Sequence, residues 1–167
     1  MKKFELTTNT KMFLGKKLFQ IKALISFGDV KAGELGGYIE KEENLSQTGD
    51  AWVFDNARVS GDARVSGNAW VTDNARVTDN ARVSGDAWVT DNACYTTIKG
   101  FGREYRTTTF FRCKDGKVRV QCGCFYGDLK EFRAIVKKTH GESKKAKEYL
   151  MIADLMELHF EENENDK

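Results

Sequence analysis

The side chains best suited to chemistry are two histidines and four cysteines, and their positions argue against a catalytic or metal centre. A general base that works near neutral pH is most simply a histidine. The sequence offers only His140, which suits the C-terminal end of a helix, and His159, both near the end of the chain. Cys122 and Cys124 share one face of a predicted strand but lack the paired knuckles of structural zinc. We therefore expect no catalytic residue, metal or cofactor, and we expect these cysteines to be core residues.

Tryptophan and arginine recur at one position of a six-residue repeat, and they are the candidate binding residues. From Val53 the chain runs VFDNAR, VSGDAR, VSGNAW, VTDNAR, VTDNAR, VSGDAW and VTDNAC, which is seven consecutive hexads. Short β-branched runs interrupted by Gly, Asp and Asn favour strands and turns over helices.

These hexads resemble the hexapeptide-repeat family, whose members fold as a left-handed parallel β-helix with three hexads in each coil. The resemblance implies a mainly β protein of about three coils, because weaker hexads begin at Ile39 and Leu45. Eight positions separate Leu45 from Val53, which predicts a two-residue insertion near Thr48 and Gly49. The family pattern predicts these inward-facing residues: Val53, Val59, Val65, Val71, Val77, Val83 and Val89, with Ala57, Ala63, Ala69, Ala75, Ala81, Ala87 and Ala93.

Residues 18 positions apart lie above one another in such a coil, at the strand spacing of about 4.8 Å. The variable position follows the inward alanine and precedes the inward valine, and side chains alternate across a strand, so its side chains point outward. Three ladders are predicted as candidate partner-binding residues: Trp52, Trp70 and Trp88 on one face, Arg58 and Arg76 on the second, and Arg64 and Arg82 on the third.

Each ladder has two interpretations that the sequence leaves open. Three stacked indoles form a larger apolar patch than a soluble monomer normally exposes. Either the protein covers them, with its C-terminal hairpin and helices or with a second subunit, or the indoles bind an external partner or stack on bases. The arginines are either solvated and offset by aspartates at the corners, or they form a phosphate-binding stripe.

The segments outside the hexads predict a cap and a small α+β domain. A turn is expected at Gly15-Lys16 in the cap. A capping box at Asp128 predicts a helix that stops before Gly141, and Ser143 begins a second helix. The predicted segments are an N-terminal β-hairpin cap in 1–36, the β-helix in 37–98, a C-terminal β-hairpin and two-helix domain in 99–160, and a disordered acidic tail in 161–167.

Charge and hydropathy restrict the expected partners and location. The chain has 27 basic and 25 acidic residues, a net charge of +2, so no global field draws it to nucleic acid. A local nucleic-acid groove stays open. No apolar run is long enough for a membrane span or a secretory leader. We expect a cytoplasmic protein that does not bind membranes.

Nearly the whole chain also resembles small hexapeptide-repeat proteins encoded by bacteriophages and prophages of Gram-positive bacteria. The resemblance rests on FQIKALISFGDVKAGELGGYIEKEENLSQTGDAWV, the hexads, TTTFFRCKDGKVRVQCGCFYGDLKEF and KAKEYL. It implies a viral protein in the cytoplasm of the bacterial host. The implied function is non-enzymatic binding of a host protein, a ribonucleoprotein or its nucleic acid, as an anti-CRISPR or other anti-defence inhibitor.

Two other functions stay open. Many members of the hexapeptide-repeat family are acyltransferases that use coenzyme A and a histidine near the coil, and this sequence has no histidine among its hexads. A divergent acyltransferase is therefore the first alternative, and a structural or assembly protein is the second. Family resemblance also implies a homo-oligomer, either a trimer or a dimer.

Overall fold

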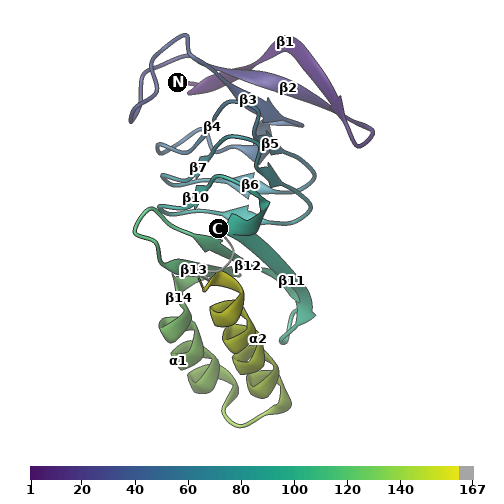
Figure 1. Ribbon diagram of the computed structural model, residues 1–167, viewed down its shortest axis with the longest axis vertical. Helices are drawn as coiled ribbons and strands as arrows, with labels where there is room; N and C mark the ends of the chain where they lie inside the picture. Colours follow the sequence, from purple (N-terminus) through teal and green to yellow (C-terminus); the bar gives the residue numbers. More distant parts are fainter. Residues whose placement is uncertain (162–167) are drawn as a thin grey trace.

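The computed structural model describes residues 1–161 and has three parts stacked along one axis (Figure 1). An N-terminal hairpin lies at one end, a parallel β-helix lies in the middle, and an antiparallel sheet with two helices lies at the other end. The tail predicted at 161–167 lies, from residue 162 onward, outside the described residues. Within residues 1–161, no helix has the length and apolar character needed to cross a bilayer.

The β-helix consists of seven two-residue strands that form three parallel ladders. Trp52 pairs with Trp70 and Val53 with Val71, so each residue lies beside the one 18 positions later. This confirms the predicted mainly β fold and its repeat. The three faces contain β4 (Trp52–Val53), β7 (Trp70–Val71) and β10 (Trp88–Val89); β5 (Arg58–Val59) and β8 (Arg76–Val77), extended by β3 (Leu35–Ile39); and β6 (Arg64–Val65) and β9 (Arg82–Val83).

Valine and alanine fill the interior of the coil as predicted. All seven hexad valines, and the alanines from Ala57 to Ala87, have an exposed fraction of 0%. Ala93 is exposed, because the chain leaves the coil through a short 3-10 helix at Asn92–Cys94. The prediction of an inward Ala93 is therefore wrong. The following residues, 95–98, belong to an antiparallel strand rather than to the β-helix.

Each corner of the coil needs a left-handed backbone conformation, which explains the Gly or Asp at the third hexad position. Aspartate is among the few residues with a side chain that adopt this region readily. A hydrogen bond from the alanine N–H to the carbonyl three residues earlier closes the turn, as between Ala57 and Phe54 at 3.0 Å. The φ angles lie between 49° and 69° at Asp55, Gly61, Gly67, Asp73, Asp79 and Gly85.

The first coil contains the predicted insertion. Leu45 forms a bridge with Val65, which lies 20 positions later, whereas Trp52 pairs with Trp70, which lies 18 positions later. Two extra residues must therefore lie between Leu45 and Trp52. They restore the regular register before the first tryptophan, so all three indoles belong to one ladder.

The N-terminal hairpin closes the first coil and extends its second face. Strand β1 (Phe4–Phe13) pairs with β2 (Lys16–Ala23), β2 pairs with β3, and β3 pairs in parallel with β5. The turn lies at Leu14-Gly15, where φ is 48° and 76°. It is one residue earlier than predicted, because a tight hairpin turn needs positive φ at both central residues and glycine best supplies the second.

Lys3 is a buried cation at this end of the coil. Its Nζ donates to the carbonyl oxygens of Gly49 at 3.2 Å and Ala51 at 2.9 Å. The same Nζ lies 4.8 Å from the centre of the Phe27 ring. Burial lowers the pKa of Lys3 from 10.5 to about 8, although the nearby Asp50 carboxylate opposes this effect.

The depressed pKa of Lys3 predicts a stability that depends on pH. Between pH 8 and pH 10.5 the unfolded chain holds this proton while the folded chain has released it. The free energy of unfolding should therefore rise with pH across this window. In Lys3→Met the rise attributable to this group should vanish. Urea denaturation of the wild type and of Lys3→Met at both ends of this pH window measures the free energy of unfolding. An identical rise in the two proteins would contradict the assignment to Lys3.

An antiparallel sheet closes the last coil. Phe111 packs on the β-helix core, while Phe110 packs on the two helices from the other face of the sheet. The backbone N–H of Arg82 donates to Thr109 Oγ1 at 3.0 Å and joins the sheet to the third face of the coil. The strands are β11 (Tyr95–Phe101), β12 (Arg106–Arg112), β13 (Val118–Cys122) and β14 (Phe125–Asp128), so the predicted hairpin is the β12–β13 pair of a four-stranded sheet.

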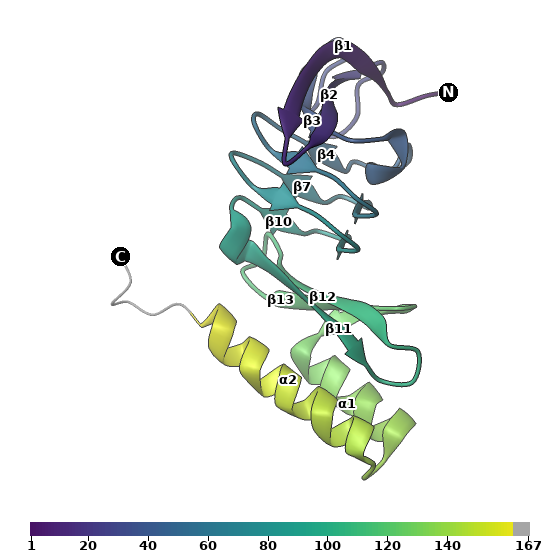
Figure 2. The same cartoon turned by 90° about the vertical axis from the view of Figure 1, so that its right-hand side faces the viewer.

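Two helices cover the far face of this sheet, as Figure 2 shows. Helix α1 (Leu129–His140) begins at the predicted capping box, in which Asp128 and Glu131 each accept a backbone N–H of the other at 2.8 Å. Helix α2 (Lys144–Phe160) begins after Ser143, whose hydroxyl accepts the N–H of Ala146. Both helix predictions are confirmed.

Candidate functional site

The three tryptophans form a ladder, but their surroundings differ. Trp52 has an exposed fraction of 0% and meets the rings of Phe4 and Phe27 edge-on, with centroids 6.2 and 5.4 Å away. Trp88 is 46% exposed. The chain itself therefore covers Trp52, as one interpretation of the ladder expected, but with a different segment. The N-terminal segment covers it, rather than the C-terminal hairpin or a second subunit, so Trp52 contacts no partner in the folded protein.

Trp70 is half-buried between the first and last indoles. Phe54 packs edge-on against it with centroids 5.3 Å apart, and Lys114 Nζ lies 3.6 Å from its ring centre. Lys114 belongs to the β12–β13 turn. Its backbone N–H donates to the carbonyl oxygen of Asp86 at 3.0 Å. The C-terminal hairpin thus covers part of Trp70, as one of the two interpretations predicted.

The arginines of the second face contact an aromatic ring within the chain. The guanidinium carbons of Arg58 and Arg76 lie 4.4 and 4.9 Å from the centre of the Phe13 ring, at the end of β1. Such contacts contribute about 0.5–1 kcal/mol each at exposed sites. This ladder therefore helps to hold the N-terminal hairpin against the coil.

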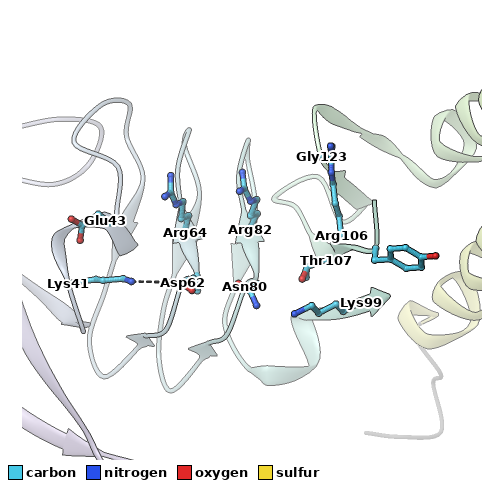
Figure 3. A pocket seen from close by; sticks show the side chains of 12 residues that line it. Lys41, Glu43, Asp62, Arg64, Asn80, Arg82, Lys99, Arg106, Thr107 and Gly123 are labelled. Carbon is cyan, nitrogen blue, oxygen red and sulfur yellow. Dashed lines mark hydrogen bonds and ion pairs between the residues drawn. The ribbon is translucent and has the colours of Figure 1, made fainter. Parts of the chain in front are cut away.

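The arginines of the third face differ, because they extend into a cleft. Arg64 and Arg82 are exposed and project in parallel from β6 and β9 (Figure 3). The cleft has a volume of about 750 Å³ and lies between this face and the edge of the C-terminal sheet, which contributes Lys99 and Arg106. We call it the basic cleft.

Five cationic and two acidic side chains line the basic cleft. Lys41 and Asp62 form an ion pair at 2.7 Å. This hydrogen bond is the largest cause of the raised pKa of Lys41 and the lowered pKa of Asp62. Within residues 1–161, the other four cations form no side-chain hydrogen bond or ion pair: Arg64, Arg82, Lys99 and Arg106. Guanidinium groups with free donors bind phosphate oxygens in a bidentate manner.

The β11–β12 hairpin places two further cations that the repeat pattern does not single out. A register shift between Ile98 and Phe101 interrupts the pairing before the turn. Arg106 packs against Gly123, where an added Cβ would collide with its guanidinium. Tyr105 stands on the rim with φ of 51° and is 67% exposed. The sequence signal is the GREYR segment at 102–106, which contains Tyr105 and Arg106; Lys99 has no such signal.

A second depression adjoins the basic cleft along the arginine ladder. Its volume is about 340 Å³, and Arg64 and Arg82 line both hollows. Ser66, Ser84 and Gln121 add hydroxyl and amide groups to its wall. The two arginines therefore face both hollows, as does the acidic side chain of Glu43.

Comparison with known proteins agrees with this architecture. Residues 57–73 match a family model described as the YdcK beta solenoid repeat. The chain therefore folds as a β-solenoid of six-residue repeats. A relative named "Uncharacterized acetyltransferase YdcK", from Escherichia coli (strain K12), is 46% identical to it over 50 residues. The match covers 29% of this chain and 15% of the relative, so the chain spans only a small part of that protein, whose name is that of an enzyme.

The two histidines and the cysteines Cys122 and Cys124 are not among the residues that line the basic cleft. The His140 ring stacks on Tyr149 with centroids 6.0 Å apart, and His159 lies against its neighbour Phe160. Cys122 ends β13 and Cys124 follows in an exposed turn, so the prediction that they share a strand face within the core is wrong. In the described part of the chain, no group of three or more side chains could hold a metal ion.

Proposed function

We propose that this hexapeptide-repeat protein is a non-enzymatic binding protein that holds the phosphate backbone of a single-stranded nucleic acid in the basic cleft. One observation carries the proposal. Four cations that form no ion pair within residues 1–161 line a single hollow of about 750 Å³. Phosphate recognition requires cationic side chains that are not already paired with acidic side chains of the same protein.

The geometry of the third face favours a strand over a single phosphate. Arg64 and Arg82 occupy paired positions of adjacent parallel strands, so they repeat at a spacing of about 4.8 Å. Ser66 beside them can donate to sugar and phosphate oxygens, whereas the hydroxyl of Ser84 donates to Gln121 Oε1 at 3.0 Å. Tyr105 offers an exposed ring at the rim, where a base can stack. The near-neutral total charge does not oppose this, because the surplus is local.

The chemistry of the lining supports binding rather than catalysis. Among the described residues, the cleft is lined by guanidinium, ammonium, amide, hydroxyl and carboxylate groups, without a histidine or a thiol. These are groups that orient an anion. For the biological role, we propose that this protein is encoded by a bacteriophage, that it occupies the nucleic acid of a host complex, and that it thereby inhibits a defence system.

Neutralising the ladder is the test. Fluorescence anisotropy with a labelled single-stranded oligonucleotide should show at least about tenfold weaker binding for Arg64→Ala/Arg82→Ala. The salt dependence should fall by about 0.7 for each lost phosphate contact. Lys137→Ala/Lys138→Ala removes the same charge from exposed positions of α1 and should change little. Equal losses in both variants, or no binding at low salt, would contradict the proposal.

One observation favours a divergent acyltransferase as a second candidate, namely the partial match to a relative with an acetyltransferase name. Coenzyme A also carries phosphates, which the basic cleft could bind. Isothermal titration with acetyl-coenzyme A distinguishes the two candidates. Tight binding of acetyl-coenzyme A that excludes the oligonucleotide would favour the transferase.

A further inference from the structure

Helix α2 presents an apolar stripe that nothing in the described chain covers. Met151, Leu155 and Leu158 are 72%, 54% and 64% exposed. They recur at i, i+4 and i+7, which places them on one face of the helix. The face that packs on α1 and on the sheet lies opposite and contains Ala146, Tyr149, Ile152, Ala153, Met156 and Phe160. Figure 2 shows α2 along the outer side of its domain, where this stripe can meet another molecule.

The charges of α2 run against its own dipole. Lys144, Lys145 and Lys147 lie at its N-terminal end, and acidic residues are absent from that first turn. Glu157 and Glu161 lie at its C-terminal end beside His159; Glu157 pairs with Arg133 within the chain at 2.6 Å, which leaves Glu161 for a contact with another molecule. This arrangement destabilises an isolated helix. It becomes favourable beside a second, antiparallel copy, because each basic end then faces an acidic one.

We infer that α2 is the contact surface for a second copy of this chain, packed antiparallel across a two-fold axis level with Ala153. Met151 then lies beside Leu155 of the partner subunit. Lys147 comes within one helical turn of Glu161 of the partner subunit. A two-fold contact uses the same patch on both subunits, so one stripe with opposite charges at its two ends suffices.

The surrounding residues leave this surface free for a copy. Within residues 1–161, neither Lys147 nor Glu161 forms an ion pair. Residues 162–167 follow α2 and contain no apolar side chain that could cover the stripe. Helix α2 has 17 residues and is about 25 Å long, so the contact can run along several turns. None of the stripe residues lines the basic cleft, so the dimer keeps both clefts open.

Sedimentation velocity of the full chain tests the inference. The mass should rise with concentration from 18.9 kDa to twice that value. Leu155→Glu should weaken association at least about tenfold. Met12→Glu is the matched control, because Met12 is 67% exposed on β1 and lies outside the stripe. Circular dichroism of both variants reports whether the fold is retained.

Charge reversal tests the antiparallel register. Lys147→Glu should weaken the dimer, and adding Glu161→Lys in the same chain should restore it, because the swap rebuilds both cross-subunit pairs. A wild-type chain that stays monomeric at every concentration would overturn the inference. A folded Leu155→Glu chain that still dimerises would also overturn it, and a failed rescue would overturn the register.

Discussion

Replacing Trp52 with alanine is expected to lower the free energy of unfolding by about 3–5 kcal/mol. Trp52 is fully buried against Phe4 and Phe27, so the truncation removes a large apolar surface and leaves a cavity between the hairpin and the coil. Trp88→Ala removes the same side chain from the same ladder, but at a position that is 46% exposed. It should lower the free energy of unfolding by only about 1 kcal/mol. Urea denaturation of the two variants gives the comparison directly.

Equal losses for the two tryptophans would contradict the account that the N-terminal segment covers the first indole. Trp52→Phe provides a further control. Within the described residues, Trp52 Nε1 has no hydrogen-bond partner, so a phenyl ring keeps most of the packing and removes a buried donor without a partner. Trp52→Phe should therefore lower the free energy of unfolding much less than Trp52→Ala does.

Gly67→Ala is expected to lower the free energy of unfolding by about 2–4 kcal/mol. Gly67 has φ of 68°, and a Cβ there would lie 2.8 Å from the backbone nitrogen of Gly85 in the next coil. The stacked corners cannot separate without breaking parallel pairing on the adjoining faces. Thermal and urea unfolding of the variant measure the loss.

Gly116→Ala is the matched control for this corner. Gly116 has φ of 76°, but a Cβ there would meet nothing within 4 Å. Gly116→Ala should therefore lower the free energy of unfolding by only about 1 kcal/mol, which is the cost of holding alanine in the left-handed backbone conformation. Similar costs at the two glycines would show that coil stacking adds nothing beyond the left-handed backbone.

The repeat itself can be predicted because its cause is local. Each hexad alternates an inward valine, a left-handed corner and an inward alanine, and this six-residue period is enough to predict that Trp52 pairs with Trp70. The two helices are predictable for the same reason, since the Asp128 capping box lies within four residues. The prediction for Ala93 is wrong because nothing in its own hexad indicates that the coil ends there.

The candidate site is only half predictable, because its composition depends on distant segments. Arg58 and Arg64 occupy equivalent hexad positions, yet Phe13 from the N-terminal hairpin contacts one of them and leaves the other free. Lys99 and Arg106 join the cleft through the docking of the C-terminal sheet. Strand β14 is only four residues long and, unlike the two-residue strands of the hexads, belongs to no repeat that would reveal it.

The central claim is that Arg64 and Arg82 contact the phosphates of a bound strand. The most direct measurement follows the Nε–Hε signals of the arginines by nitrogen-15 NMR during titration with a single-stranded oligonucleotide. The account predicts shifts for Arg64 and Arg82 and little change for Arg133, which Asp154 and Glu157 hold at 2.9 and 2.6 Å. Unchanged Arg64 and Arg82 signals beside a shifted Trp88 indole would contradict it and place the strand on the tryptophan face.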